Sequence, residues 1–234
     1  MLFIRSLLFY IGLGSTTFLV VTAMVLAFFL PPIKRNRISA IWTHFVLWWL
    51  KMTCNVHYKI EGLENIPSTP SIVLSKHQSG WETFAFQKIF PTQAYVLKRE
   101  LLWIPVFGLG LLMFSPIAID RSAGREALKK LVRLGEVRLR QGFWVVIFPE
   151  GTRIPPGKRG RYHIGGAWLA AHTGTQVVPV AHNAGLCWPK KFIKYPGVIH
   201  VSIGKPIQTV GLKADAVNRL VEAWIETEML KLND

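Results

Sequence analysis

Long and short apolar runs divide the chain into an N-terminal part and a longer part of alternating elements. Residues 7–30 contain no charged side chain. As a helix they would reach roughly 36 Å at about 1.5 Å per residue, enough to cross a hydrocarbon core about 30 Å thick. A cleaved signal peptide would have a shorter apolar region and a small-residue cleavage site. We therefore predict a retained membrane segment, which either spans the bilayer or lies in one leaflet.

A second helix is predicted over residues 38–50, where apolar residues recur at helical spacing. The stripe consists of Ile38, Ile41, Trp42, Phe45, Val46 and Trp49. Because tryptophans beside a basic run are typical of the membrane interface, we expect this helix to lie at headgroup level. Together with residues 7–30 it would form a two-helix membrane-docking unit. A core-facing helix shows the same spacing and is the alternative.

The distribution of basic residues predicts on which side of the membrane the rest of the chain lies. Lys34, Arg35 and Arg37 follow the apolar segment, whereas only Arg5 precedes it, and this bias leaves the rest of the chain in the cytoplasm if the segment spans. The chain carries 28 Lys and Arg against 13 Asp and Glu, a formal net charge of +15. Without a nucleic-acid-binding motif, this charge fits an anionic membrane surface or anionic substrates better than nucleic acid. The two cysteines lack metal-ligand spacing, which favours a reducing compartment.

From about residue 55 onward, short β-like runs alternate with helical patterns, which predicts an α/β domain. The expected strands are 56–60, 71–75, 94–98, 116–120, 143–148, 175–181 and 198–204, and the expected helices are 81–89, 101–112, 123–140, 164–173 and 213–230. The last helix is expected to serve packing only. We thus predict a mixed sheet flanked by helices over residues 55–234, preceded by the membrane-docking unit over residues 1–54.

The stretch SKHQSGWETF (75–84) places His77 and Glu82 five positions apart. On one regular helix this separation turns the two side chains about 140° apart, so both could not face one substrate. They can act together only if His77 lies in the turn after strand 71–75 and Glu82 lies in the first turn of the next helix. Ser79 could then be the N-cap, with Glu82 completing a capping box. A capping role for Glu82 and a core role for His77 are the alternatives to a general-base pair.

A second polar block, FPEGTR (148–153), follows an apolar strand. Gly151 would let backbone N–H groups approach an anion, and Arg153 offers a planar fork suited to a phosphate. The carboxylate of Glu150 would accept hydrogen bonds from hydroxyl groups. An ordinary β-turn with a surface arginine is the alternative.

These two blocks, followed by VPV (178–180) on a later strand, resemble the glycerophospholipid acyltransferase family, most closely its bacterial members that acylate 1-acyl-sn-glycerol 3-phosphate. The resemblance extends from Gly62 to Pro206, and the N-terminal unit is similar to the family's membrane anchor. It implies acyl transfer from acyl-CoA or acyl-carrier protein to the sn-2 hydroxyl of lysophosphatidate, giving phosphatidate. It further implies no metal, cofactor or nucleic acid, and a place on the cytoplasmic face of a bacterial inner membrane.

The resemblance also assigns roles to matching positions. His77 would be the general base on the acceptor hydroxyl, oriented by Glu82, which stands where the family has aspartate. Substrate binding would fall to Lys98, Arg121, Glu150, Gly151, Thr152 and Arg153. Lys76 stands where the family has asparagine, a second departure. Glycerol 3-phosphate or another lysophospholipid as acceptor, or a basic membrane-anchored binding protein without turnover, are the alternatives.

Overall fold

A computed structural model describes residues 1–233 of the chain, with only the backbone of Arg37 and Asn233. Asp234, the last residue of the expected domain, lies outside the described residues. The strands are β1 (Val56–Glu61), β2 (Ile72–Ser75), β3 (Gln93–Lys98), β4 (Ile117–Ile119), β5 (Trp144–Ile147), β6 (Val177–His182) and β7 (Gly197–Ile203). The helices are α1 (Leu2–Leu26), α2 (Pro32–Cys54), α3 (Trp81–Ile89), α4 (Phe107–Met113), α5 (Gly124–Arg140), α6 (Gly165–Thr173) and α7 (Ala214–Asn233). Short 3₁₀ turns are η1 (Leu63–Asn65), η2 (Arg99–Trp103) and η3 (Arg121–Ala123).

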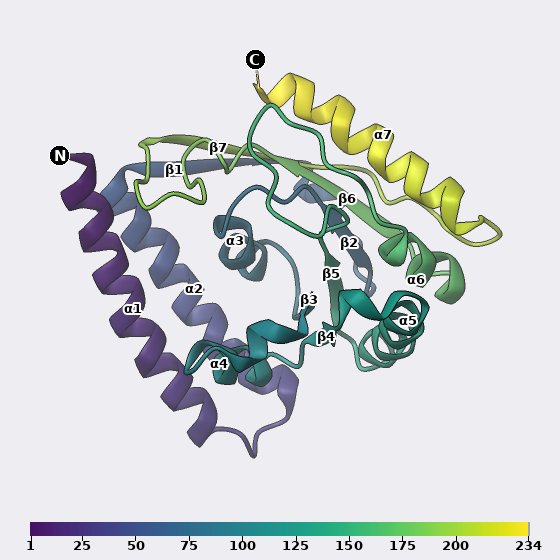
Figure 1. Cartoon of the computed structure of the whole chain (residues 1–234), viewed down its shortest axis with the longest axis horizontal. Coiled ribbons are helices and arrows are strands. Elements are labelled where there is room, and N and C mark those ends of the chain that lie inside the picture. The colour runs from purple at the N-terminus through teal and green to yellow at the C-terminus, as the bar shows by residue number, and fades with distance from the viewer. Residues whose placement is uncertain (234) are drawn as a thin grey trace.

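Within these residues the strands form one sheet in the order β1-β7-β6-β2-β5-β3-β4 (Figure 1). Neighbouring strands are parallel except β6 and β7, which are antiparallel. The predicted mixed α/β sheet is confirmed. Because β2, β3, β4, β5 and β6 run the same way, their carboxyl ends meet at one edge, where α/β proteins usually bind ligands.

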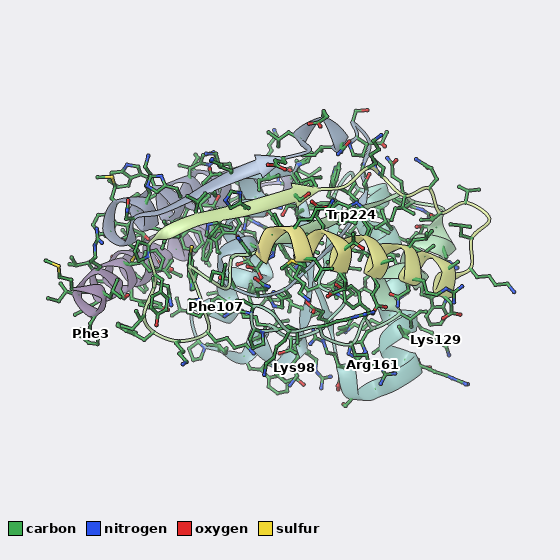
Figure 2. The ribbon with its side chains drawn as sticks, turned by 90° about the horizontal axis from the view of Figure 1, so that it is seen from above. Phe3, Lys98, Phe107, Lys129, Arg161 and Trp224 are labelled. Atoms are coloured by element: carbon green, nitrogen blue, oxygen red, sulfur yellow. The ribbon has the colours of Figure 1, made fainter. Side chains whose placement is uncertain are left out.

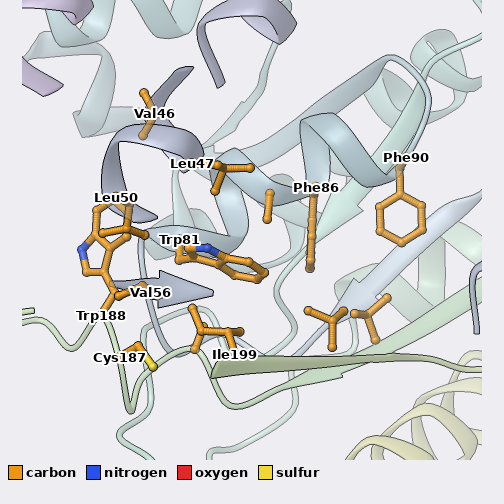
Figure 3. Packing of buried hydrophobic residues seen from close by; sticks show 14 of the residues in the cluster. Val46, Leu47, Leu50, Val56, Trp81, Phe86, Phe90, Cys187, Trp188 and Ile199 are labelled. Carbon is orange, nitrogen blue, oxygen red and sulfur yellow. The ribbon is translucent and has the colours of Figure 1, made fainter. Parts of the chain in front are cut away.

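Helices cover both faces of the sheet (Figure 1). Alternate residues of β2 illustrate this: Val73 packs into the core on the α2 and α3 side, whereas Ile72 and Leu74 pack into the core that includes residues of α6 and α7. In Figure 3, Trp81 and Phe86 of α3 lie among residues of α2, β1 and β7. Helix α3 is therefore held on both sides, and the turn that precedes it is fixed with it.

Helices α1 and α2 pack against each other as an antiparallel pair (Figure 1). The indole N–H of Trp42 donates to Thr16 Oγ1 at 3.1 Å, and that of Trp49 donates to the carbonyl of Leu8 at 3.2 Å. The tryptophans of the predicted stripe thus face α1 rather than lipid headgroups. Both side chains are half-buried, and their indole N–H groups are satisfied within the pair.

Helix α2 is a core helix along its other side. Val46, Leu47 and Leu50 are buried in one cluster with residues of the sheet, while Ile41 and Trp48 stay exposed. One side of α2 covers α3 and β1, as the core-facing alternative expects, while a place at headgroup level for its exposed side stays a prediction. The division of the chain at residues 54 and 55 stays a prediction: α2 ends at Cys54, but its side chains share a core with the sheet.

The continuous helix expected over residues 101–112 is wrong. The structure has the 3₁₀ turn η2, a break around Pro105, and the short helix α4. Proline lacks the N–H that a continuing helix would use and disfavours helical geometry in the residue before it. Val106 follows with φ of +62°, a region that is costly for a β-branched residue.

Candidate active site

A cavity of about 690 Å³ opens where the parallel strands end. His77 follows β2, Phe148 to Arg153 follow β5, Lys98 ends β3 and Arg121 follows β4. The remaining wall is mostly apolar and comes from α1, α2, α3 and the segment around α4, with Val21, Trp42, Phe84, Leu101, Phe107, Leu111 and Phe114 among its residues. The cavity therefore joins a basic region at the sheet edge to an apolar region beside the N-terminal helices.

His77 and Glu82 are brought together as a pair. His77 lies in the turn after β2 and Glu82 lies in the first turn of α3, as their spacing required. The distance from His77 Nδ1 to Glu82 Oε1 is 2.7 Å. The imidazole ring stacks on Phe148, with ring centroids 4.1 Å apart, and 15% of its side chain is exposed at the cavity. With Nδ1 bound to the carboxylate, Nε2 is the nitrogen left for a substrate proton, since it has no hydrogen-bond partner among the described residues.

Glu82 is fixed by more than the histidine. Its Oε1 also accepts from the backbone N–H of Ser79 at 2.8 Å and of Gln78 at 3.0 Å. The N–H of Trp81 donates to Ser79 Oγ, so Ser79 and the first turn of α3 exchange bonds much as in a capping box, although the N-cap is Gly80, one residue later than predicted. The capping and orienting roles are thus carried by the same carboxylate.

The Glu82 carboxyl is fully buried, and its ionisation depends on its neighbours. Burial alone would raise its pKa, but the N–H dipole of the nearby His182 ring and the bonds from His77 and the Ser79 N–H hold the pKa below the ordinary value. Oε2 is buried without a hydrogen-bond partner in the described part of the chain. The anionic form is therefore retained mainly through Oε1, the oxygen that holds the histidine.

His182 lies behind the pair, with its Nε2 3.9 Å from Glu82 Oε1. Its Nδ1 accepts from the N–H of Ala184, and its Nε2 lies 2.9 Å from the carbonyl of Lys76. This arrangement assigns the proton to Nε2 and leaves the ring neutral, in agreement with a pKa lowered by burial. His182 is enclosed, at the end of β6, and is a structural neighbour of the pair rather than a second base.

Four basic side chains line the cavity near His77. Lys98, Arg121 and Arg153 were expected from the sequence, and Lys190 comes from the loop between β6 and β7. Arg153 has no ion-pair partner among residues 1–233, whereas Lys98 lies 3.8 Å from Glu100. Thr152 also lines the cavity. A region so rich in positive charge, part of it unpaired, is suited to a phosphate-bearing ligand.

The expectation was that the N–H of Gly151 binds an anion. In the structure this N–H is already hydrogen-bonded within the turn. Gly151 has φ of +68°, a conformation that favours glycine. Its N–H donates to the carbonyl of Phe148, and its own carbonyl accepts from Arg121 Nη1. The N–H is thus already used, and Gly151 serves to orient the guanidinium of Arg121 at the cavity.

Glu150 is not at the cavity wall, which corrects the expectation that it binds substrate hydroxyl groups. Its side chain is fully buried. Oε2 accepts from the backbone N–H of His77 at 3.0 Å, and Oε1 accepts from Lys76 Nζ at 2.7 Å. Both oxygens are occupied by the protein itself. Glu150 therefore holds the turn that carries the histidine.

Lys76 extends this contact to the C-terminal helix. Its buried ammonium also donates to Glu226 Oε1 of α7 at 2.9 Å, and Tyr162 OH donates to the same oxygen at 2.8 Å. A buried lysine is tolerated when carboxylates pair with it. Helix α7, expected to serve packing only, thus also supplies one charge of the group that fixes the turn at His77.

Sequence reasoning missed Lys190 and the partners of Lys76. A lysine directly after an apolar strand does indicate a buried charge in need of a carboxylate, but Glu226 lies 150 positions away. Lys190 sits in a loop whose path depends on tertiary contacts, so its sequence gives no sign of the cavity.

Comparison with known proteins gives consistent matches. The model of a family described as Acyltransferase matches residues 57–183. The chain is 44% identical to a 1-acyl-sn-glycerol-3-phosphate acyltransferase of Pseudomonas aeruginosa, over 98% of this chain and 92% of that one. It is 31% identical to a chloroplastic 1-acyl-sn-glycerol-3-phosphate acyltransferase of Arabidopsis thaliana, over 92% of this chain and 61% of that one. The crystal structure of the Thermotoga maritima 1-acyl-sn-glycerophosphate acyltransferase has the same fold, with a TM-score of 0.81, 23% identity, and 98% and 95% of the two chains covered.

Replacing Lys76 tests whether the buried charges hold the turn. Lys76→Met leaves Glu150 and Glu226 without their shared cation, and breaking such a buried pair costs about 3–5 kcal/mol. We expect this loss in the free energy of unfolding, measured by urea denaturation in detergent. The matched variant Lys129→Met removes an exposed pair with Glu126 and should cost no more than about 1 kcal/mol. Equal, small losses in both variants would show that Lys76 is not paired as described.

Proposed function

This chain belongs to the acyltransferase family, and we propose that His77 and Glu82 form its catalytic pair. The reaction is acyl transfer from a thioester to the sn-2 hydroxyl of 1-acyl-sn-glycerol 3-phosphate, giving phosphatidate, which is the activity of its named relatives. The observation that carries the proposal is the 2.7 Å contact between His77 Nδ1 and Glu82 Oε1, at a cavity that also holds unpaired basic side chains.

The proton steps follow from the geometry of the pair. Glu82 accepts from Nδ1–H, so the lone pair of His77 lies on Nε2 and can remove the proton of the sn-2 hydroxyl. The alkoxide oxygen then forms a bond to the thioester carbonyl carbon. The tetrahedral intermediate collapses, the C–S bond breaks, and the thiolate takes the proton back from Nε2. During the proton transfer the Glu82 carboxylate stabilises the positive imidazolium.

Holding the acceptor is the work of the basic side chains. Arg153 has no carboxylate partner among the described residues, and Arg121 is oriented by the carbonyl of Gly151. In the proposal these two guanidiniums bind the acceptor phosphate, and Lys98 and Lys190 add positive charge. The phosphate thereby sets the distance of the sn-2 hydroxyl from Nε2. Such positioning contributes to the rate because it replaces a random encounter by a fixed geometry.

Membrane association is indicated by α1, the one described helix that is long and apolar enough to cross a bilayer. We propose that it lies in one leaflet instead. Near its start, Ser6 Oγ accepts from the N–H of Lys194, and near its end Val21 packs directly on Gly110 of α4. A helix held against the body at both ends could stand across the bilayer only if the body entered the hydrocarbon, which its charged surface opposes.

The proposal also covers the acyl donor and the face of the membrane on which the protein lies. Either acyl-CoA or acyl-carrier protein supplies the thioester, since the basic cavity mouth suits the phosphates of both carriers. These donors are cytoplasmic, so we place the protein on the cytoplasmic face of a bacterial inner membrane. The chemistry proposed for the pair uses neither a metal nor a cofactor.

Replacing the base tests the catalytic pair. We expect His77→Ala to lower kcat/KM for lysophosphatidate by roughly 10²–10⁴-fold, the usual contribution of a general base, while binding to vesicles is unchanged. His44→Ala, at an exposed position of α2, is the matched control and should keep full activity. The measurement is thioester consumption by purified protein. Turnover retained by the His77 variant would disprove the assignment.

Arg153 is tested through the acceptor. Arg153→Gln should raise KM for lysophosphatidate roughly tenfold or more, because hydrogen bonds to charged groups contribute about 1.5–3 kcal/mol. The weaker rate with a 1-acylglycerol, which has no phosphate, should stay the same. Arg159→Gln, which alters an exposed pair with Glu222, is the control. An equal effect on both acceptors would contradict phosphate binding by Arg153.

A further inference from the structure

The segment Arg99–Met113, formed by η2 and α4, carries a second apolar surface apart from α1. Six of its hydrophobic side chains are between 43% and 68% exposed: Trp103, Ile104, Val106, Phe107, Leu109 and Leu112. Hydrophobic surface residues are common singly, but so many in one short segment mark a site of contact with a partner or a membrane. The break at Pro105 is part of this surface, since the residues on both sides of it are exposed.

The segment is attached to the N-terminal helices. A Cβ atom on Gly110 would lie 2.7 Å from the side chain of Val21 of α1, so this side chain packs directly on the backbone of α4. Arg35 at the start of α2 donates to the carbonyl of Met113 at 2.9 Å and to that of Phe28 at 3.0 Å. One guanidinium thus ties the end of α4 to the turn between α1 and α2. Lipid that covers α1 would therefore also contact α4.

One aromatic side chain of each element, Phe3 and Phe107, can be located on a common side of the molecule. In Figure 2, Phe3 of α1 and Phe107 of α4 both lie in the lower half of the view, and so do the basic residues Lys98 and Lys129. Aromatic and aliphatic side chains beside lysine and arginine are the composition of a surface that rests in the headgroup region of an anionic membrane. The single acidic residue of the segment, Glu100, lies beside Lys98.

The same segment is a wall of the cavity. Leu101, Phe107, Gly110 and Leu111 line it from within, while their neighbours are exposed on the outside. Where the cavity is apolar, this short segment separates it from the surroundings of the protein. The turn at Val106 is held at a positive φ despite its cost, and strain of this kind is concentrated at functional sites.

We propose that Arg99–Met113 is a second membrane-inserting element, which enters the same leaflet as α1 and gives the acyl chain of the acceptor direct passage from the leaflet to the cavity. The role of the segment in acceptor entry rests on the proposed function. Its insertion into the membrane does not require turnover. A second copy of this chain on the same surface is the competing occupant. It is disfavoured because the adjoining helix α1 is apolar over most of its 25 residues and mostly exposed, which suits contact with lipid hydrocarbon.

Spin labels test the insertion directly. Single cysteines would be placed at Ile104, at Leu19 of α1 and at Val210, which is exposed in the loop before α7, after the buried Cys54 and Cys187 are replaced by alanine. In phosphatidylethanolamine–phosphatidylglycerol vesicles, labels at 104 and 19 should collide with oxygen and be shielded from a water-soluble nickel complex. The label at 210 should show the opposite.

An aqueous label at 104 beside a lipid-exposed label at 19 would overturn the proposal. So would a label at 104 that is shielded from both reagents and shows spin–spin coupling to a second copy. A label at 104 in lipid supports the insertion even if the protein fails to acylate lysophosphatidate, so the failure of the proposed function is recognised separately.

Activity tests the purpose of the insertion. The double variant Trp103→Ser/Ile104→Ser changes no cavity-lining residue. Its kcat/KM for lysophosphatidate embedded in vesicles should fall about tenfold, because less apolar surface enters the leaflet. Its kcat/KM for a short-chain, water-soluble lysophosphatidate should stay the same, and Val210→Ser should change neither. Equal losses with both acceptors would overturn the role in acceptor entry.

Discussion

The arrangement of the site depends on one buried oxygen, Oε1 of Glu82. It accepts hydrogen bonds from the ring of His77 and from the backbone N–H groups of Gln78 and Ser79. The backbone bonds start α3 and fix the turn, and the ring bond sets which nitrogen of the imidazole faces the cavity. Because the carboxyl is buried, its charge is stabilised by these donors and by His182 rather than by water. The same oxygen therefore fixes the local backbone and orients the base.

Buried charged side chains also fix the turn that carries His77, on its side away from the cavity. Glu150 binds the N–H of His77 on one oxygen and Lys76 on the other, and Lys76 reaches Glu226 on α7. The base is thus connected to the opposite layer of the fold. On the cavity side, basic side chains face a wall that is otherwise apolar. The site can hold a molecule with a phosphate and a hydrocarbon chain, as lysophosphatidate has, close to the N-terminal helices.

Much of this arrangement could be predicted because it is local. The strands, the place of His77 after β2 and the first-turn position of Glu82 follow from periodicity and turn chemistry over a few residues. The partners of Lys76 could not, since Glu226 is brought near only by the folding of α7 onto the sheet. The role of Glu150 was misjudged for the same reason: its residue type suits a ligand, but only burial shows that both oxygens are occupied. The break at Pro105 was missed because the apolar pattern continues through it.

Catalysis by this pair requires Glu82 to hold His77 with the proton on Nδ1 and the lone pair on Nε2. The most direct measurement is the pair of ¹⁵N chemical shifts of the His77 ring at neutral pH, in membrane-bound protein and assigned by their loss in His77→Gln. We expect a protonated Nδ1 and an unprotonated Nε2. We also expect this preference to be lost in Glu82→Leu, which removes the accepting oxygen. A proton on Nε2 in the unaltered protein would show that Glu82 does not orient His77 as a base.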